Sequence, residues 1–471
     1  MITGIIAEYN PFHRGHAHQI AAARAAGAGP IVAVMSGNFV QRGEPALFSK
    51  RRRAEAALLC GADLVLELPL PWALSTAQNF AEGGVGALMG LGCTEALSFG
   101  SESGEAGLLR RAAAAADSPL LKPLLDKYLA EGIPFAAARE KAAAAVFGPA
   151  VAAVFTRPND TLAAEYLAAA GRAGAGWEIL PVRRVGAAHD QAPPPAASPE
   201  ALWENGGRFP HGRALEHPRW AADTGGPGCR LNGRAADADR LQSASGIRTL
   251  LLRGDTEQAL ACMPTAAACV FRQALAAEGM IRPRRLETAL LCHMRRMGKE
   301  DFARLPDVSE GLENRLHAAA RQAVSLEDFY RRAKTRRYPL ARLRRLALAA
   351  FLGLDNRFFR QPLPYIRVLG FTPAGREVLA RAKKTAGLPL ILRARDVEKL
   401  DRRARDVFQS ECRADDLFWL AADRPRPCGT DYTDPVVKID LPSADPGCSK
   451  IILGAQESLV AAFSPRDDSG A

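Results

Sequence analysis

Short apolar runs separated by longer amphipathic stretches fill the first hundred residues. Four of these runs are bounded by turn residues, as is typical of buried strands: 4–7, 30–35, 63–68 and 96–99. The stretches between them carry start and stop signals and predict helices over residues 16–26, 50–59 and 78–91. Strands that alternate with helices predict an α/β fold with a doubly wound parallel sheet. In such a sheet, ligand sites lie at the carboxyl ends of the strands.

Helical patterns dominate the rest of the chain. A three-part helical segment, a further helix and a fifth strand are predicted over 105–147, 159–170 and 177–185. The Pro- and Gly-rich stretch that follows, about 186–240, is typical of a long mobile loop. A short helix opens at Ser243, and the pattern beyond residue 259 is largely helical. Two later runs resemble strands of a small C-terminal α/β piece: 364–371 and 388–392.

Charge and composition narrow the classes of partner. The 471 residues carry a formal net charge of +11, which favours an anionic partner such as nucleic acid, although an Arg-rich coding bias gives the same balance. Nine cysteines without a C-x-x-C pair are typical of reduced thiols, with neither a zinc site nor a disulfide framework. The absence of an 18-residue apolar run or a secretory leader pattern predicts a cytoplasmic protein without membrane contact.

Two histidines stand where the first strand passes into the first helix, in the string His13-Arg14-Gly15-His16. Residues three apart at a helix start share one face, so both imidazoles can present N–H donors to one point. A nucleotide phosphate under attack spreads charge over its oxygens, and fixed donors stabilise that charge without a protein nucleophile. The alternative is a pair of ordinary loop or core histidines.

This histidine string, together with residues 35–46 (MSGNFVQRGEPA), resembles the bacterial tRNA(Met) cytidine acetate ligase family within the HIGH-type nucleotidyltransferase superfamily. The resemblance implies a HIGH-type domain that converts ATP and acetate into acetyl-adenylate. It further implies acetylation of the N4 amine of the wobble cytidine of elongator tRNA(Met), with Mg²⁺ accompanying ATP. Arg14 departs from the family, which usually has Asn at that position.

The resemblance also implies site residues. His13 and His16 are the expected catalytic pair. The expected ATP-binding residues are Ile6, Ala7, Glu8, Tyr9, Asn10, Pro11, Phe12, His13, Gly15, His16, Gly100, Asn159, Arg184, Ser243, Ser245 and Arg248. Hydroxyl residues at a helix start followed by Arg on the same face suit phosphate, although a capped helix explains Ser243 equally simply. Asn159 could likewise be a simple helix N-cap. If the match to the family is offset by one residue, Arg183 takes the role assigned here to Arg184.

A basic segment lies in the second half of the chain. Residues 331–345 hold eight Arg or Lys side chains and no acid, with Tyr330 and Tyr338 nearby. Guanidinium groups suit phosphate contacts and base stacking, but a solvated helix face has the same composition. The expected tRNA contacts are Arg336, Arg337, Arg344 and Arg345. We therefore expect an adenylating domain over 1–255, containing the mobile loop, and a mostly helical, basic tRNA-binding region over 256–471.

Two other functions share some of these features. An adenylyltransferase for a small phosphorylated metabolite would have the same first motif, but it leaves the basic C-terminal region unexplained. A non-catalytic RNA-binding protein with a nucleotide fold would explain the charge, but it leaves the intact histidine pair unexplained.

Overall fold

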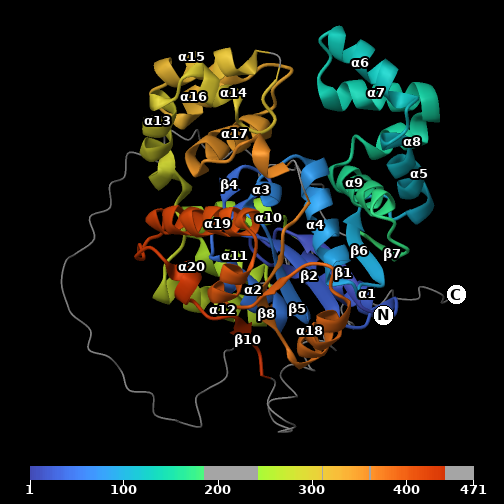
Figure 1. Ribbon diagram of the computed structural model, residues 1–471, viewed down its shortest axis with the longest axis vertical. Coiled ribbons are helices and arrows are strands. Elements are labelled where there is room, and N and C mark those ends of the chain that lie inside the picture. Colours follow the sequence, from blue (N-terminus) through green and yellow to red (C-terminus); the bar gives the residue numbers. More distant parts are fainter. Residues whose placement is uncertain (185–241, 310, 360–361, 441–471) are drawn as a thin grey trace, which may run out of the picture.

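The fold is built on one mixed sheet. The computed structural model describes residues 1–184, 242–309, 311–359 and 362–440. Its strands run in the order β10-β8-β5-β2-β1-β6-β7, with β9 beside β8 (Figure 1). Their bounds are β1 Thr3–Ala7, β2 Ile31–Ser36, β5 Leu64–Leu68, β6 Ala96–Ser101, β7 Glu178–Arg183, β8 Ile366–Phe371, β9 Leu390–Ile391 and β10 Val437–Lys438. The predicted loop at about 186–240 lies outside the described residues.

The chain winds in both directions from β1, so the prediction of a doubly wound α/β sheet is confirmed. Strands β2 and β5 follow on one side of β1 and β6 and β7 on the other, and all five are parallel. Since this order reverses beside β1, the carboxyl end of β1 lies at the topological switch point where such folds bind ligands. A two-stranded hairpin, β3 Phe39–Val40 with β4 Glu44–Pro45, follows β2 at that edge.

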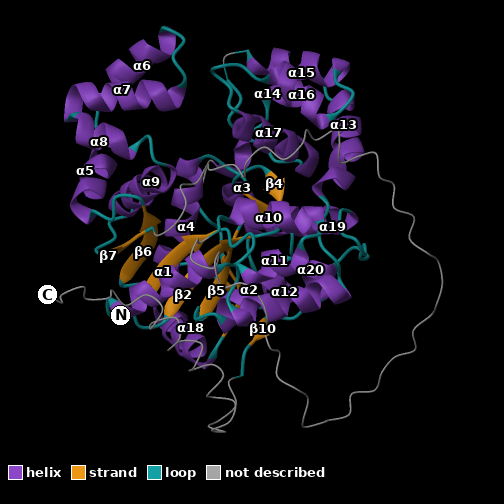
Figure 2. Cartoon of the chain, turned by 180° about the vertical axis from the view of Figure 1, so that it is seen from behind, coloured by secondary structure: helices purple, strands orange, loops and turns teal. Residues whose placement is uncertain are grey.

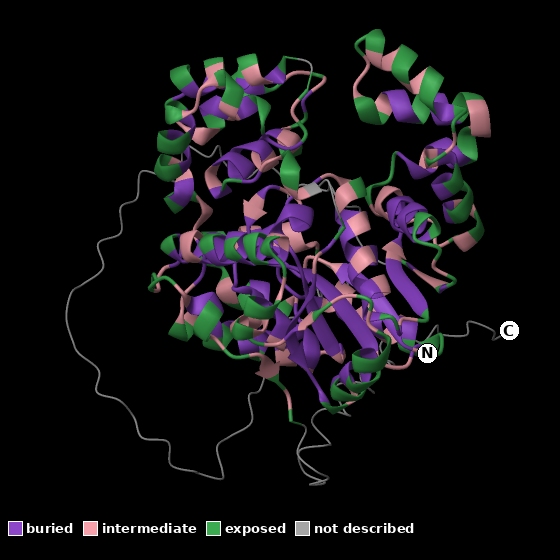
Figure 3. Cartoon of the chain, in the orientation of Figure 1, coloured by how far each residue is buried: buried purple, intermediate pink, exposed green. Residues whose placement is uncertain are grey.

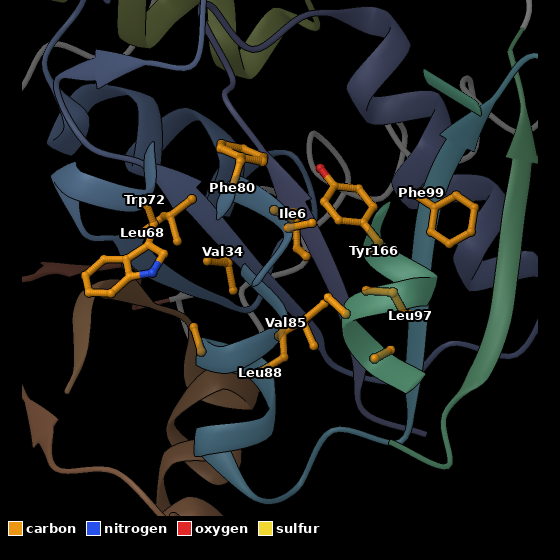
Figure 4. Packing of buried hydrophobic residues seen from close by; sticks show 14 of the residues in the cluster. Ile6, Val34, Leu68, Trp72, Phe80, Val85, Leu88, Leu97, Phe99 and Tyr166 are labelled. Atoms are coloured by element: carbon orange, nitrogen blue, oxygen red, sulfur yellow. The ribbon is translucent and has the colours of Figure 1, made fainter. Parts of the chain in front are cut away.

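Helices cover both faces of the sheet (Figure 2). Consecutive strand residues point to opposite faces, so Ile5 packs in one cluster with α1 (Arg14–Ala25), α2 (Lys50–Leu59), α10 (Ala244–Arg253) and α12 (Thr265–Ala277). Ile6 packs in the other cluster, mainly with α4 (Ala77–Leu91), α5 (Ala106–Ala116) and α9 (Pro158–Arg172) (Figure 4). The central strands β1, β2 and β5 are accordingly buried on both sides, whereas the edge strand β7 is mostly half-buried (Figure 3).

The C-terminal strands extend this sheet. Strand β8 pairs antiparallel with β5, in register Leu64↔Phe371, and β9 and β10 pair with β8. All six residues of β8 are buried, so its apolar surface is covered on both faces. The predicted C-terminal α/β piece therefore shares the first sheet instead of forming one of its own.

The remaining helices form two groups above the strands (Figure 1). The first group contains α6 Leu121–Ala130, α7 Phe135–Phe147 and α8 Pro149–Val154. The three pieces predicted over 105–147 are α5, α6 and α7, so that prediction is confirmed. The second group contains α13 Glu287–Arg296, α14 Lys299–Ala303, α15 Leu312–Gln322, α16 Leu326–Ala333 and α17 Leu340–Leu352. Other short or C-terminal elements are α3 Leu70–Ala73, α11 Thr256–Ala261, η2 Pro283–Leu286, η3 Asn356–Phe359, α18 Pro373–Thr385, η4 Ala394–Lys399, α19 Arg402–Leu420 and α20 Thr430–Thr433.

The interpretation of residues 331–345 as one basic helix is wrong. The segment is divided between α16, which ends at Ala333, and α17, which begins at Leu340. Pro339 caps α17, and the residue before a proline disfavours helical dihedrals, so the helix cannot run through. The arginines of this segment consequently point in several directions instead of lining one face.

Candidate functional site

His13 and His16 form a stacked pair at the carboxyl end of β1. His13 is the N-cap of α1, and its Nδ1 accepts a hydrogen bond from the backbone N–H of Gly15 at 3.0 Å. The Nδ1 of His16 accepts from the backbone N–H of His13 at 3.2 Å, which completes a reciprocal capping box. The two ring centroids lie 3.9 Å apart. The predicted placement of both rings on one face is therefore confirmed.

These hydrogen bonds set the protonation of both rings. Because each Nδ1 accepts a hydrogen bond, each neutral ring carries its proton on Nε2. Burial, followed by the charges of Arg184 and Arg248, lowers the pKa of His13 to about 3. Burial and the neighbouring His13 lower the pKa of His16 well below its usual value. The pair therefore offers two neutral N–H donors at neutral pH.

This protonation predicts a pH dependence of stability. The unfolded chain binds protons at His13 and His16 below about pH 6.5, whereas the folded chain does not. The free energy of unfolding is therefore expected to fall as pH drops below about 6.5, by up to about 1.4 kcal/mol per pH unit for each histidine. Urea unfolding of the wild type and of a His13→Asn, His16→Asn double variant at pH 7 and 5.5 measures this. Equal slopes would contradict it.

The segment between β1 and α1 is tightly packed. Tyr9 has a positive φ of 48°, and the Asn10–Pro11 peptide that follows is cis. The Tyr9 and Phe12 rings contact His16 at centroid distances of 4.8 and 5.4 Å. Tyr9 and Phe12 are almost fully buried, and their rings hold the imidazole of His16 in place.

Gly15 is required by the imidazole of His13. A Cβ at position 15 would lie 2.8 Å from Cε1 of that ring, closer than side chains pack. The Gly15→Ala variant is expected to fold, since alanine favours a helix, but to displace the ring and lower kcat for adenylation roughly tenfold or more. Steady-state pyrophosphate release together with circular dichroism measures this. Full activity in a folded Gly15→Ala variant would show that the ring position is unimportant.

The start of α10 lies beside this turn. Ser243 is the N-cap of α10 and accepts from the N–H of Gly246. Arg248 donates to the carbonyl oxygen of Asn10 at 3.0 Å and to Oγ of Ser245 at 3.3 Å, and it pairs with Glu44 at 2.8 Å. The start of α10 and the guanidinium of Arg248 thus lie next to the histidines, an arrangement that favours binding of a polyphosphate.

Two charged side chains near Arg248 complete this region. Arg42 donates to Oγ of Ser245 at 2.9 Å and lies 3.9 Å from the carboxylate of Glu8. Burial and the charge of Glu44 raise the pKa of Glu8, against the effect of Arg42. Residues Ile6, Ala7 and Pro11 contribute the surrounding backbone. From the sequence, residues 41–44 are expected either to face a substrate or to form a solvated turn, and the structure brings Arg42 into contact with Ser245.

A third group lies at the carboxyl end of β6. Arg184 donates to Oδ1 of Asn159 at 3.5 Å and lies beside Gly100. Arg183 instead lines a hollow with residues of α1. Of the two arginines, Arg184 therefore lies among the predicted site residues.

Two acidic residues that the sequence reasoning missed hold this group in place. Glu102 accepts from the Asn159 side chain at 2.6 Å and from the Asp160 N–H at 2.7 Å. Asp160 is fully buried and accepts from Ser101 and from the N–H groups of Glu102 and Ser103. An acid directly after a strand at the site edge was the available signal for Glu102.

The four predicted tRNA-binding arginines do not share one environment. Arg336 is exposed, whereas Arg337 donates to the Leu129 carbonyl of α6 at 3.0 Å. Arg345 donates to the Gln41 carbonyl at 3.4 Å, and Arg344 lines a cavity beside Glu44. Contact of these residues with tRNA stays a prediction. Arg14, which departs from the family pattern, is half-buried, and its backbone N–H donates to the carbonyl oxygen of Cys262.

Helix α17 packs directly on the loop between β3 and β4. Gly43 has a φ of +78°, and a Cβ there would lie 2.6 Å from both the Arg344 Cβ and the Arg345 nitrogen. The loop that carries Arg42 and Glu44 is therefore positioned by the C-terminal region.

No group of three or more histidine, cysteine, aspartate or glutamate side chains is placed to hold a metal ion within the described residues. The cysteines described by the structure are free thiols. In the same ranges, no helix has both the length and the apolar character needed to cross a membrane.

Comparison with known proteins places this geometry in a family. The family model HIGH Nucleotidyl Transferase matches residues 1–201 and 230–430. The tRNA(Met) cytidine acetate ligase of Thermoanaerobacter sp. (strain X514) is 31% identical over 446 residues, which cover 93% of this chain and 100% of the relative. This chain belongs to the tRNA(Met) cytidine acetate ligase family. The family member of Syntrophotalea carbinolica is 34% identical and matches 82% of this chain and 84% of its own length.

Solved structures of the same ligase family share the fold. The chain superposes on Thermotoga maritima TmcAL bound with alpha-thio ATP with a TM-score of 0.78, at 28% identity and over 93% of this chain and 100% of that one. The apo form of the same protein gives a TM-score of 0.79. The sequence resemblance and the predicted HIGH-type fold with a helical C-terminal region are thereby confirmed.

Proposed function

We propose that this protein activates acetate with ATP as acetyl-adenylate and then acetylates the N4 amine of the wobble cytidine of elongator tRNA(Met). The observation that carries the proposal is the stacked, neutral histidine pair beside Arg248 at the carboxyl end of β1. Its support from outside the structure is the match to cytidine acetate ligases over most of the chain. A tRNA substrate further implies a cytoplasmic location.

The first step forms a mixed anhydride at the α-phosphate. A carboxylate oxygen of acetate attacks phosphorus, the bond to the bridging oxygen breaks, and pyrophosphate leaves with the electron pair. The Nε2–H groups of His13 and His16 are the donors that stabilise the charge on the α-phosphate oxygens. The start of α10, with Ser243, Ser245 and Arg248, holds the β- and γ-phosphates.

The base and ribose of ATP then extend toward the end of β6. Gly100, Asn159 and Arg184 lie at this end of the sheet, and the backbone of residues 6–12 lines the way to it. Mg²⁺ would accompany the nucleotide and would supply charge neutralisation on its phosphates.

The second step transfers the acetyl group. The N4 nitrogen attacks the acetyl carbonyl carbon, a C–N bond forms, and AMP leaves as the acyl–phosphate bond breaks. The basic segment 331–345 supplies tRNA contacts, with Arg336 exposed and Arg344 closest to the loop at Glu44. Phosphate contacts of this kind make binding salt-sensitive.

One experiment tests both steps. Purified protein is incubated with ATP and acetate, with and without bulk tRNA, and pyrophosphate and nucleoside masses are measured. An acetyl mass on cytidine is the expected result. Pyrophosphate release without a modified nucleoside would refute the assignment of tRNA cytidine as the acetyl acceptor.

The alternatives give different results in that experiment. An adenylyltransferase acting on a small phosphorylated metabolite yields a stable dinucleotide-like product and needs no acetate. A non-catalytic RNA-binding protein binds tRNA but releases no pyrophosphate.

A further inference from the structure

A cavity of about 810 Å³ lies between the β3–β4 hairpin and the helices α13 and α16, beside the point where α17 contacts Gly43. One wall is formed by residues 43–45, which are part of the loop that α17 positions. The facing wall contains Tyr330 and Lys334 as well as the acids Glu287 and Glu327, and Arg344 lines the cavity beside the hairpin. None of the residues proposed above to hold ATP lines this cavity. Its volume is within the range of small-molecule and nucleotide pockets.

Glu44 links the cavity to the phosphate-binding region. Its side chain lines the cavity, and its carboxylate lies 2.8 Å from Arg248, which in turn donates to Asn10 beside the histidine pair. Oε1 of Glu44 is buried and is the oxygen that lies 2.8 Å from Arg248, whereas the side chain as a whole is 25% exposed. The part of the carboxylate that Arg248 does not cover is therefore open to a donor in the cavity.

The facing wall has the chemistry of a single-stranded RNA site. Lys334 is exposed and Arg344 half-buried, and among the residues that the structure describes neither has a carboxylate partner. Tyr330 is half-buried and lines the same cavity, and its ring makes a T-shaped contact with Phe329 at a centroid distance of 5.6 Å. An aromatic face with flanking cations is what an unstacked base and its two phosphates require.

We propose that this cavity receives the unstacked target cytidine of the acceptor tRNA and that Glu44 is the base for acetyl transfer. This inference rests on the function proposed above. Tyr330 stacks on the pyrimidine, and Lys334 and Arg344 contact the flanking phosphates. A carboxylate accepts a hydrogen bond from the N4 amine of cytosine. As N4 bonds to the acetyl carbon and AMP leaves with the electron pair, the N4 proton passes to Glu44.

Separate measurement of the two half-reactions tests this assignment. Adenylation is followed as acetate-dependent exchange of pyrophosphate into ATP, and transfer as single-turnover acetylation of tRNA from acetyl-adenylate formed on the enzyme. Glu44→Gln keeps an oxygen for Arg248 but cannot take a proton. It is expected to slow transfer on the order of 10²-fold more than it slows adenylation.

Two variants test the RNA wall of the cavity. Tyr330→Ala is expected to weaken tRNA binding, measured by filter retention, roughly tenfold to a hundredfold. Lys334→Ala removes an exposed side chain without a packing change. It is expected to weaken tRNA binding severalfold and to reduce the salt dependence of that binding. Lys383→Ala, an equally exposed charge on α18, is the matched control and should bind tRNA like the wild type.

The outcomes separate this inference from the proposed function. A wild type that does not acetylate tRNA would refute the function itself. If the wild type acetylates tRNA but Glu44→Gln slows both half-reactions equally, Glu44 only positions Arg248 and is not the base for acetyl transfer. Unchanged tRNA binding by both Tyr330→Ala and Lys334→Ala would place the cytidine elsewhere.

Discussion

Replacing His16 with asparagine is expected to lower the rate of acetate-dependent ATP turnover on the order of 10²- to 10³-fold in a protein that still folds. An asparagine amide reaches about as far as Nδ1 of histidine, so its oxygen can still accept from the backbone N–H of His13 and keep the capping box. What it removes is the donor at the Nε2 position. Pyrophosphate release with saturating ATP and acetate measures the loss.

Two further variants make this result specific. Glutamine places its amide near the Nε2 position, so His16→Gln is expected to retain more activity than His16→Asn although it loses the cap, at a cost of about 1 kcal/mol in stability. His18→Ala, on the same helix but lining the hollow beside β7, is the matched histidine control and should turn over normally. Near-normal turnover by a folded His16→Asn protein would remove the histidine pair from the mechanism.

The histidine pair could be predicted from sequence because its geometry is local. A strand, a turn and a helix start fix His13 and His16 within four residues of each other, and the same local logic placed Ser243 at the start of a helix. Backbone hydrogen bonding decides such positions with little help from the rest of the fold. The predicted strands and helices of the first hundred residues follow the same rule.

Contacts between distant segments could not be predicted in this way. Lys50 is fully buried between Glu67 at 2.7 Å and Asp431 at 2.8 Å, and Arg367 of β8 also pairs with Asp431. No local pattern shows that residues 381 positions apart neutralise one another. The addition of β8 to the first sheet depends on the same contacts, since they fill the boundary between β5 and the C-terminal helices.

The arrangement of the site loops depends on another long-range interaction, made by Arg53. This side chain is fully buried in α2 and donates to the carbonyl oxygens of Glu8 at 2.8 Å, Ser36 at 3.1 Å and Phe48 at 3.0 Å, and also to that of Gly37. Burial lowers its pKa to about 10, against the opposing charges of Glu67 and Glu8, so it remains a cation. One guanidinium thus connects the segments that leave β1 and β2 at the active edge of the sheet.

Arg53→Met is therefore expected to destabilise the protein by about 3 kcal/mol or more, because buried carbonyl groups lose a charged donor that no water can replace. Urea unfolding measures the loss. The matched control is Arg52→Met, which removes a half-exposed arginine paired with Glu278 and Glu55 from the same helix and should cost about 1 kcal/mol or less. Since the Glu8 carbonyl directly precedes Tyr9, any Arg53→Met protein that folds should also adenylate acetate more slowly than the control. Equal stability of the two variants would mean that the loops after β1 and β2 hold their positions without Arg53.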